Sequence, residues 1–88
     1  MPYTLHVLFY DYGPDIATRR APHLGLIAKY NQDGRMPIAG AYGDPVRGGL
    51  LVFTTKEAAE QFHGEDPYAH NGLVEDWRVE PWTVVTPE

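Results

Sequence analysis

The chain has 88 residues, with 12 acidic and seven basic side chains and a formal net charge of −5. This length predicts a single domain spanning residues 1–88. The absence of cysteine and serine excludes a cysteine or serine nucleophile, and the acidic surface disfavours binding to a phosphate backbone.

No apolar run reaches the roughly 20 residues that span a bilayer, so no membrane association is expected. The N-terminus lacks the basic segment and long apolar core of a secretion signal, which favours a cytoplasmic protein. A domain this small is marginally stable by itself and has no disulfide to support it. We therefore expect a homodimer.

Residues 3–11 alternate in the manner of a β-strand. One face carries Tyr3, Leu5, Val7 and Phe9, and we expect this face to pack against helices. The other face carries Thr4, His6, Leu8 and Tyr10. Its mixed polarity suits a pocket or a partner surface, since buried polar groups need hydrogen-bond partners.

A turn at residues 12–15 precedes a helix with Pro22 in its first turn, where a missing N–H costs nothing. Gly34 fits the position just after the helix. At helical spacing, the residues expected to share the inner face are Leu24, Ile27, Ala28 and Asn31.

The second half of the chain is predicted to hold a strand at 35–42, a turn at 43–45, and a strand at 48–53 that is apolar on both faces. Thr54 and Glu57 have capping-box spacing and open a second helix that Gly64 closes. A short turn then runs to Gly72. The last strand covers 74–84, with a bend or bulge predicted after Pro81, where the apolar positions change parity.

Two helical crossovers give a ferredoxin-like βαββαβ α+β fold with sheet order 4-1-3-2. Pro37 and Pro81 fall on the two edge strands of this order, where a missing ladder donor is tolerated. One helical layer covers only one sheet face. The apolar residues left on the other face favour a dimeric α+β barrel.

Two residues could form an acid–base pair. His23 lies in the first turn of a helix, whose dipole favours a neutral imidazole that could act as a base. Asp66 precedes Pro67 as an N-cap residue would, and its carboxylate could also orient the imidazole. A capping or surface histidine and a purely structural aspartate are the alternatives.

Other chemistries receive little support. The spacing of the four histidines, with no cysteine, does not form a metal-ligand pattern, so neither a metal nor another cofactor is expected. Gly40 and Gly43 fit a strand end and a turn better than a phosphate-binding loop.

Several segments together resemble the YCII-related family over almost the whole chain. They are Arg20-x-x-His23-Leu24, Asp33-Gly34-Arg35, Ala39-Gly40, Asp66-Pro67-Tyr68, and Gly72-Leu73-Val74 with Trp77. The resemblance implies a dimeric ferredoxin-like barrel whose pocket holds a catalytic histidine and aspartate, matched here by His23 and Asp66. Activities in this family and in related barrels include dehydrochlorination of a chlorinated hydroxyhydroquinone and muconolactone isomerisation.

The leading hypothesis is therefore a small dimeric enzyme that performs cofactor-free acid–base chemistry on a cyclic or aromatic substrate, by elimination, isomerisation or a lactone-type reaction. His23 and Asp66 would be catalytic. The residues expected to bind the substrate are Arg20, Tyr68, His6, Tyr10 and Gly40. One alternative is a non-catalytic domain that binds a small molecule in the same pocket, and another is a structural dimer without a ligand.

Overall fold

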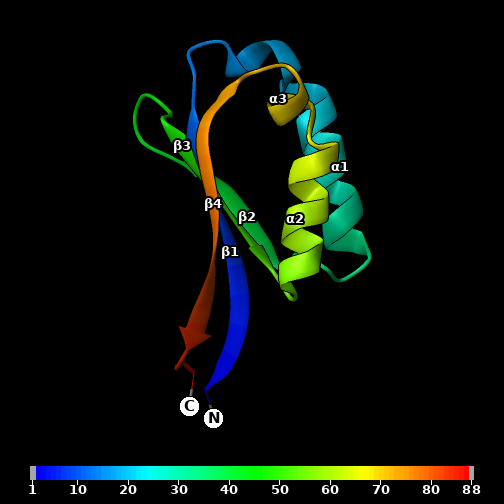
Figure 1. The fold of residues 1–88 in the computed structure, drawn as a ribbon, viewed down its shortest axis with the longest axis vertical. Helices are drawn as coiled ribbons and strands as arrows, with labels where there is room; N and C mark the ends of the chain where they lie inside the picture. The colour runs from blue at the N-terminus through cyan, green and yellow to red at the C-terminus, as the bar shows by residue number, and fades with distance from the viewer. Residues whose placement is uncertain (1, 88) are drawn as a thin grey trace.

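The computed structural model describes residues 2–87 and contains a four-stranded sheet with helices on one side (Figure 1). In chain order the elements are β1 (Tyr3–Tyr12), a 3-10 helix (Ile16–Arg19), α1 (Arg20–Gln32), β2 (Ile38–Tyr42), β3 (Gly48–Phe53), α2 (Lys56–Glu65), α3 (Pro67–His70) and β4 (Val74–Val84).

The sheet is antiparallel throughout and has the order β2-β3-β1-β4. This is the predicted order 4-1-3-2, and the α+β ferredoxin-like fold is confirmed. Figure 1 shows β1 and β4 continuing beyond the helices, toward the end of the molecule where both termini lie. One sheet face is therefore covered by helices over part of its length, and no helix of residues 2–87 covers the other face.

The two faces of β1 are the reverse of the prediction. Leu8 and Tyr10 are completely buried in the core beneath the helices, whereas Val7 and Phe9 line a groove on the uncovered face. Alternation fixes which residues share a face but not which face the helices cover. Tyr10 can occupy the core because its hydroxyl finds a partner there, 3.0 Å from Nδ1 of His63.

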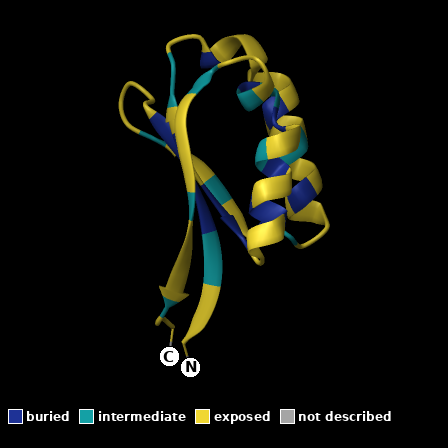
Figure 2. Cartoon of the chain, in the orientation of Figure 1, coloured by how far each residue is buried: buried dark blue, intermediate teal, exposed yellow. Residues whose placement is uncertain are grey.

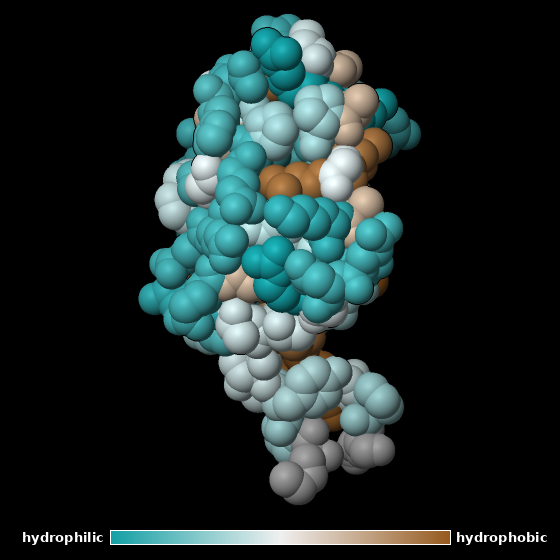
Figure 3. All heavy atoms as spheres, turned by 90° about the vertical axis from the view of Figure 1, so that its right-hand side faces the viewer, coloured by the Kyte–Doolittle hydropathy of each residue, from teal (hydrophilic) through white to brown (hydrophobic). Residues whose placement is uncertain are grey.

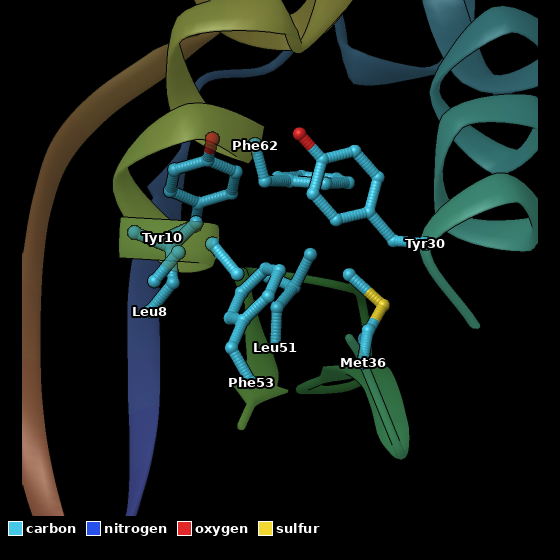
Figure 4. Close-up of a cluster of buried hydrophobic side chains, with 9 residues drawn as sticks. Leu8, Tyr10, Tyr30, Met36, Leu51, Phe53 and Phe62 are labelled. Carbon is cyan, nitrogen blue, oxygen red and sulfur yellow. The ribbon is translucent and has the colours of Figure 1, made fainter. Parts of the chain in front are cut away.

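The core lies between the sheet and the two long helices, as the burial pattern in Figure 2 shows. The rings of Tyr30, Phe53 and Phe62 contact one another, with centroids 5.2 to 6.1 Å apart. Figure 4 shows this cluster, whose buried members are Leu8, Tyr10, Tyr30, Met36, Leu51, Phe53, Ala58, Ala59 and Phe62.

The inner face of α1 also differs from the prediction. His23 and Tyr30 are its buried residues, while Leu24 is 52% exposed. Tyr30 donates a hydrogen bond to Oε1 of Glu65 at 2.6 Å. Burial and this bond raise the pKa of Tyr30 to about 12, so the hydroxyl stays a donor. The prediction used only apolar residues, so it did not find an inner face formed by His23 and Tyr30, whose polar atoms have hydrogen-bond partners on other elements.

Some element boundaries shift by a few residues. β2 begins at Ile38, so Pro37 precedes the strand and is not part of an edge. The N-cap of α2 is Thr55, not Thr54, and its side chain accepts a hydrogen bond from the Ala58 amide. Gly64 lies inside α2. Gly34, directly after α1 and its C-cap, has a φ of 86°, which glycine adopts without strain.

β4 pairs with β1 without a bulge at Pro81; the one register shift between these strands is at Asp11 and Tyr12. Trp77 stacks on His63 of α2, whereas Trp82 lines the groove on the uncovered face. The apolar residues change sides because β4 runs past the end of the helical layer (Figure 1). Pro81 does lie on an edge strand, as predicted.

The two surfaces of the molecule differ in character. Viewed from the helical side, the surface is largely hydrophilic (Figure 3). The uncovered sheet face instead exposes Ile38 (66%), Leu50 (40%) and Trp82 (48%) around two grooves. None of the helices within residues 2–87 is long and apolar enough to cross a membrane.

Candidate active site

A cavity of about 350 Å³ opens beside α1, between this helix and the sheet. Its lining comes from the end of β1, the 3-10 helix, α1, β2, the β2–β3 turn, β3 and α3, and it is mainly apolar. The polar side chains that line it are those of Tyr12, Arg20, His23 and Tyr68. A mainly apolar cavity with a few convergent polar groups is typical of a small-molecule site.

His23 forms part of the cavity wall although it is only 4% exposed. Its Nδ1 lies 2.7 Å from Oδ1 of Asp66, which comes from the junction between α2 and α3. Because a carboxylate oxygen only accepts, Nδ1 is the nitrogen that carries the hydrogen of this bond. Nε2 is then left as the basic nitrogen of a side chain that lines the cavity.

Asp66 is completely buried and serves two structures at once. Its Oδ1 also accepts the backbone N–H of Tyr68 at 3.1 Å, so the carboxylate is the N-cap of α3, as the Asp66-Pro67 pair predicted. The cap holds the aspartate at one position in the fold. Its other oxygen, Oδ2, is buried without a hydrogen-bond partner.

The ring of Tyr68 fixes the imidazole from one side. The two rings are parallel within 5° and their centroids are 3.7 Å apart. Phe62 meets the same imidazole edge-on, with a centroid distance of 6.1 Å. His23 is therefore held by a carboxylate and two aromatic rings, which leaves it little rotational freedom.

The structure brings five of the seven residues predicted for the site together and leaves two apart. Arg20 and Gly40 line the cavity with His23 and Tyr68, and Asp66 contacts His23 from behind. Tyr10 and His6 do not line this cavity. Tyr10 is in the core behind Asp66, and Nδ1 of His6 is buried without a partner.

The sequence analysis missed Tyr12. Burial, with a smaller contribution from the negative charge of nearby Asp66, raises its pKa, so the phenol remains protonated. A Cβ on Gly49 would collide with the Tyr12 hydroxyl, which means that this glycine makes room for the ring. The signal was present in the alternation of β1, because Tyr10 and Tyr12 share a face.

No group of three or more potential metal ligands occurs within residues 2–87. The cavity wall carries the imidazole of His23, the phenols of Tyr12 and Tyr68 and the guanidinium of Arg20. These groups are suited to anion binding and proton transfer.

No protein-family model matches the chain, and no curated protein sequence matches it either. Solved structures do match it. One is 5-chloro-2-hydroxyhydroquinone dehydrochlorinase (TftG) from Burkholderia phenoliruptrix AC1100, in complex with 2,5-dihydroxybenzoquinone. The TM-score is 0.74 at 18% identity, over 89% of this chain and 92% of that one.

Two further structures are similar over nearly their full lengths. Rv0793 from Mycobacterium tuberculosis has a TM-score of 0.57 at 14% identity, covering 99% of this chain and 98% of that one. NE2512 from Nitrosomonas europaea, a protein of unknown function, has a TM-score of 0.54 at 14% identity, covering 100% and 94%. At these low identities the similarities show the fold alone, and this chain shares that fold with a dehydrochlorinase.

Proposed function

We propose that this chain is a YCII-related enzyme that performs cofactor-free acid–base chemistry on a small cyclic or aromatic substrate. The observation that carries the proposal is the 2.7 Å contact between Nδ1 of His23 and Oδ1 of Asp66 at the wall of an apolar cavity. The fold shared with a dehydrochlorinase supports the same kind of reaction.

In the proposed reaction, Nε2 of His23 takes a proton from a C–H or O–H group of the substrate. The electron pair released from that bond forms a new double bond, and the leaving group departs with its own bonding pair as an anion such as chloride. In an isomerisation, His23 returns the same proton to another carbon. Asp66 stabilises the imidazolium in either case.

The cavity walls suggest which substrates fit. Arg20 brings a positive charge to a lining that is otherwise mainly apolar, and Tyr12 adds a phenol that stays protonated. These two groups would bind an oxyanion or carbonyl of a flat ring, while the apolar wall packs against its face. Hydroxylated quinones and halogenated hydroquinones have these features.

The test is turnover of halogenated hydroquinones and small lactones by wild type and by His23→Gln. Proton transfer by a positioned base contributes about 10²- to 10⁴-fold, so the variant should lose activity by that factor. His70→Gln, which changes an exposed histidine, is the matched control and should keep full activity. Equal turnover by wild type and His23→Gln would refute the mechanism.

A non-catalytic binding domain is the second candidate, because the Asp66 carboxylate already has a structural task as the cap of α3. In that case 2,5-dihydroxybenzoquinone and related compounds would bind to the wild-type protein, and no compound in the panel would be turned over.

We also propose that the chain forms a homodimer through the uncovered sheet face. Ile38, Leu50 and Trp82 are exposed there around two apolar grooves, and a second copy of the same face would bury them. Leu50→Glu should give a monomer by light scattering, while Leu24→Glu should not, because this half-exposed leucine of α1 lines neither groove of that face. A wild-type monomer at high concentration would contradict the proposal.

A further inference from the structure

A second polar cluster lies near the His23–Asp66 pair, and its residues Tyr10 and His63 do not line the cavity. The hydroxyl of Tyr10 is 3.0 Å from Nδ1 of His63, and Tyr10 is completely buried. Figure 4 shows Tyr10 rising from β1 with its hydroxyl directed toward α2. His63 belongs to the last turn of α2, three residues before Asp66, so both side chains belong to the same end of this helix.

One carboxylate oxygen of Asp66, Oδ2, lacks a hydrogen-bond donor. Oδ1 accepts two hydrogen bonds, from the Tyr68 amide and from His23, whereas Oδ2 is buried with none. Buried carboxylate oxygens are almost always paired, because desolvation without a hydrogen bond is costly. The Tyr10 hydroxyl is close enough for the charge of Asp66 to raise its pKa, in addition to the larger effect of burial.

The single hydroxyl proton of Tyr10 can be donated to His63 or to Asp66, and the tautomer of His63 decides between them. If His63 carries its proton on Nε2, its bare Nδ1 accepts from Tyr10 and Oδ2 of Asp66 stays unpaired. If it carries the proton on Nδ1, that N–H donates to the Tyr10 oxygen. The hydroxyl is then free for Asp66, and every group is satisfied.

We propose that His63 and Tyr10 are positioning residues for the base: Nδ1–H of His63 orients the Tyr10 hydroxyl, which donates to Oδ2 of Asp66. The carboxylate then receives donors on both oxygens, and its hold on the His23 proton is correspondingly weaker. The consequence for catalysis rests on the proposed function, because it matters only if His23 is the base. The hydrogen bonds themselves do not depend on any reaction.

The surroundings of His63 are compatible with this arrangement. Burial lowers the pKa of His63, Asp66 opposes that effect and His70 adds to it, so the ring is neutral above pH 7. Tyr10 of β1 is the titratable group in direct contact with His63. The uncharged ring of Trp77 in β4 stacks on His63 with the ring centroids 3.8 Å apart. A neutral imidazole with a donor on Nδ1 is therefore possible at physiological pH.

The first readout is the tautomer of His63, measured at pH 7.5 from ¹⁵N chemical shifts of the histidine rings in the full-length protein. We expect the Nδ1–H form in wild type, and a return to the commoner Nε2–H form in Tyr10→Phe. An Nε2–H tautomer in wild type would mean that Tyr10 donates to His63, and would overturn the proposal.

The second readout is the titration midpoint of the His23 ring. Tyr10→Phe removes one donor from Asp66, so the carboxylate binds the His23 proton more tightly and the midpoint rises by about half to one pH unit. Tyr30→Phe is the control, since it removes the hydroxyl of another buried core tyrosine, whose partly buried hydrogen bond goes to Glu65 instead. Equal midpoints in wild type and Tyr10→Phe would refute the coupling.

These readouts need no substrate, so they separate this inference from the proposed function. If the His23 titration midpoint shifts in Tyr10→Phe but His23→Gln keeps full turnover, the hydrogen-bonded cluster is supported and the enzyme mechanism is refuted. If the midpoint does not shift but His23→Gln abolishes turnover, the enzyme mechanism is supported and the coupling through Tyr10 is refuted.

Discussion

Replacing Asp66 with alanine or with asparagine separates what its carboxylate contributes as a cap from what it contributes as a charge. Oδ1 accepts the Tyr68 amide at 3.1 Å and His23 Nδ1 at 2.7 Å. Alanine removes both contacts. Loss of the cap costs about 1 kcal/mol, and the buried donor left unpaired on His23 costs roughly 1–3 kcal/mol. The free energy of unfolding should therefore fall by about 2–4 kcal/mol.

Asparagine keeps an acceptor oxygen at the same position. The variant loses the stronger, charge-assisted character of the two bonds but also removes a charge that is completely buried. We expect a change below about 1 kcal/mol.

The assay is urea unfolding at a fixed chain concentration, because dimerisation would make stability depend on concentration. With a slope near 1 kcal/mol per M, the midpoint should fall by about 2–4 M for alanine and by less than about 1 M for asparagine. Asp76→Ala is the control: Asp76 accepts the Trp77 amide at 2.9 Å but is exposed, so a change within about 0.5 kcal/mol is expected. Equal losses for the two Asp66 variants would refute the reasoning.

Three further predictions concern the core, the cavity and pH. Phe62→Ala removes a ring from the centre of the core and should cost about 3–5 kcal/mol in urea unfolding; a loss below 1 kcal/mol would contradict the packing described. Gly49→Ala should push the Tyr12 ring from its place and weaken quinone binding by calorimetry, whereas Gly25→Ala, which meets no neighbour, should not. Because burial lowers the pKa of His63 in the folded protein, the unfolded chain binds the proton more readily. Stability should fall as pH drops below about 6.5, and this fall should be smaller in His63→Asn; identical pH profiles would count against it.

The fold was predictable because its signals are local and agree with one another. The alternation of β1, the glycine after α1 and the Asp66-Pro67 cap each depend on neighbours in the chain, and all three occur where expected. The orientation of β1 was not predictable, since alternation is the same whichever face the helices cover. Tyr10 is in the core because a partner 53 residues away satisfies its hydroxyl.

The candidate site was likewise predictable only in part. His23 and Asp66 carry local signatures, a place in a first helical turn and an aspartate before proline, and resemblance to a family joined them. The ring of Tyr68 against the imidazole, the phenol of Tyr12 and the cluster of Tyr10 with His63 depend on contacts between distant segments. They follow from how α3 packs against α1 and how α2 packs against β1, which the sequence pattern of each element does not specify.

The most direct test of the account is whether the Asp66 carboxylate controls the protonation of His23. The measurement is an NMR titration of the histidine rings in wild type and in Asp66→Asn. Removing a negative charge 2.7 Å from Nδ1 destabilises the imidazolium. The account predicts that the His23 midpoint falls by about one pH unit or more, while the exposed His70 changes little. A His23 titration curve that is the same in both proteins would contradict the acid–base pair.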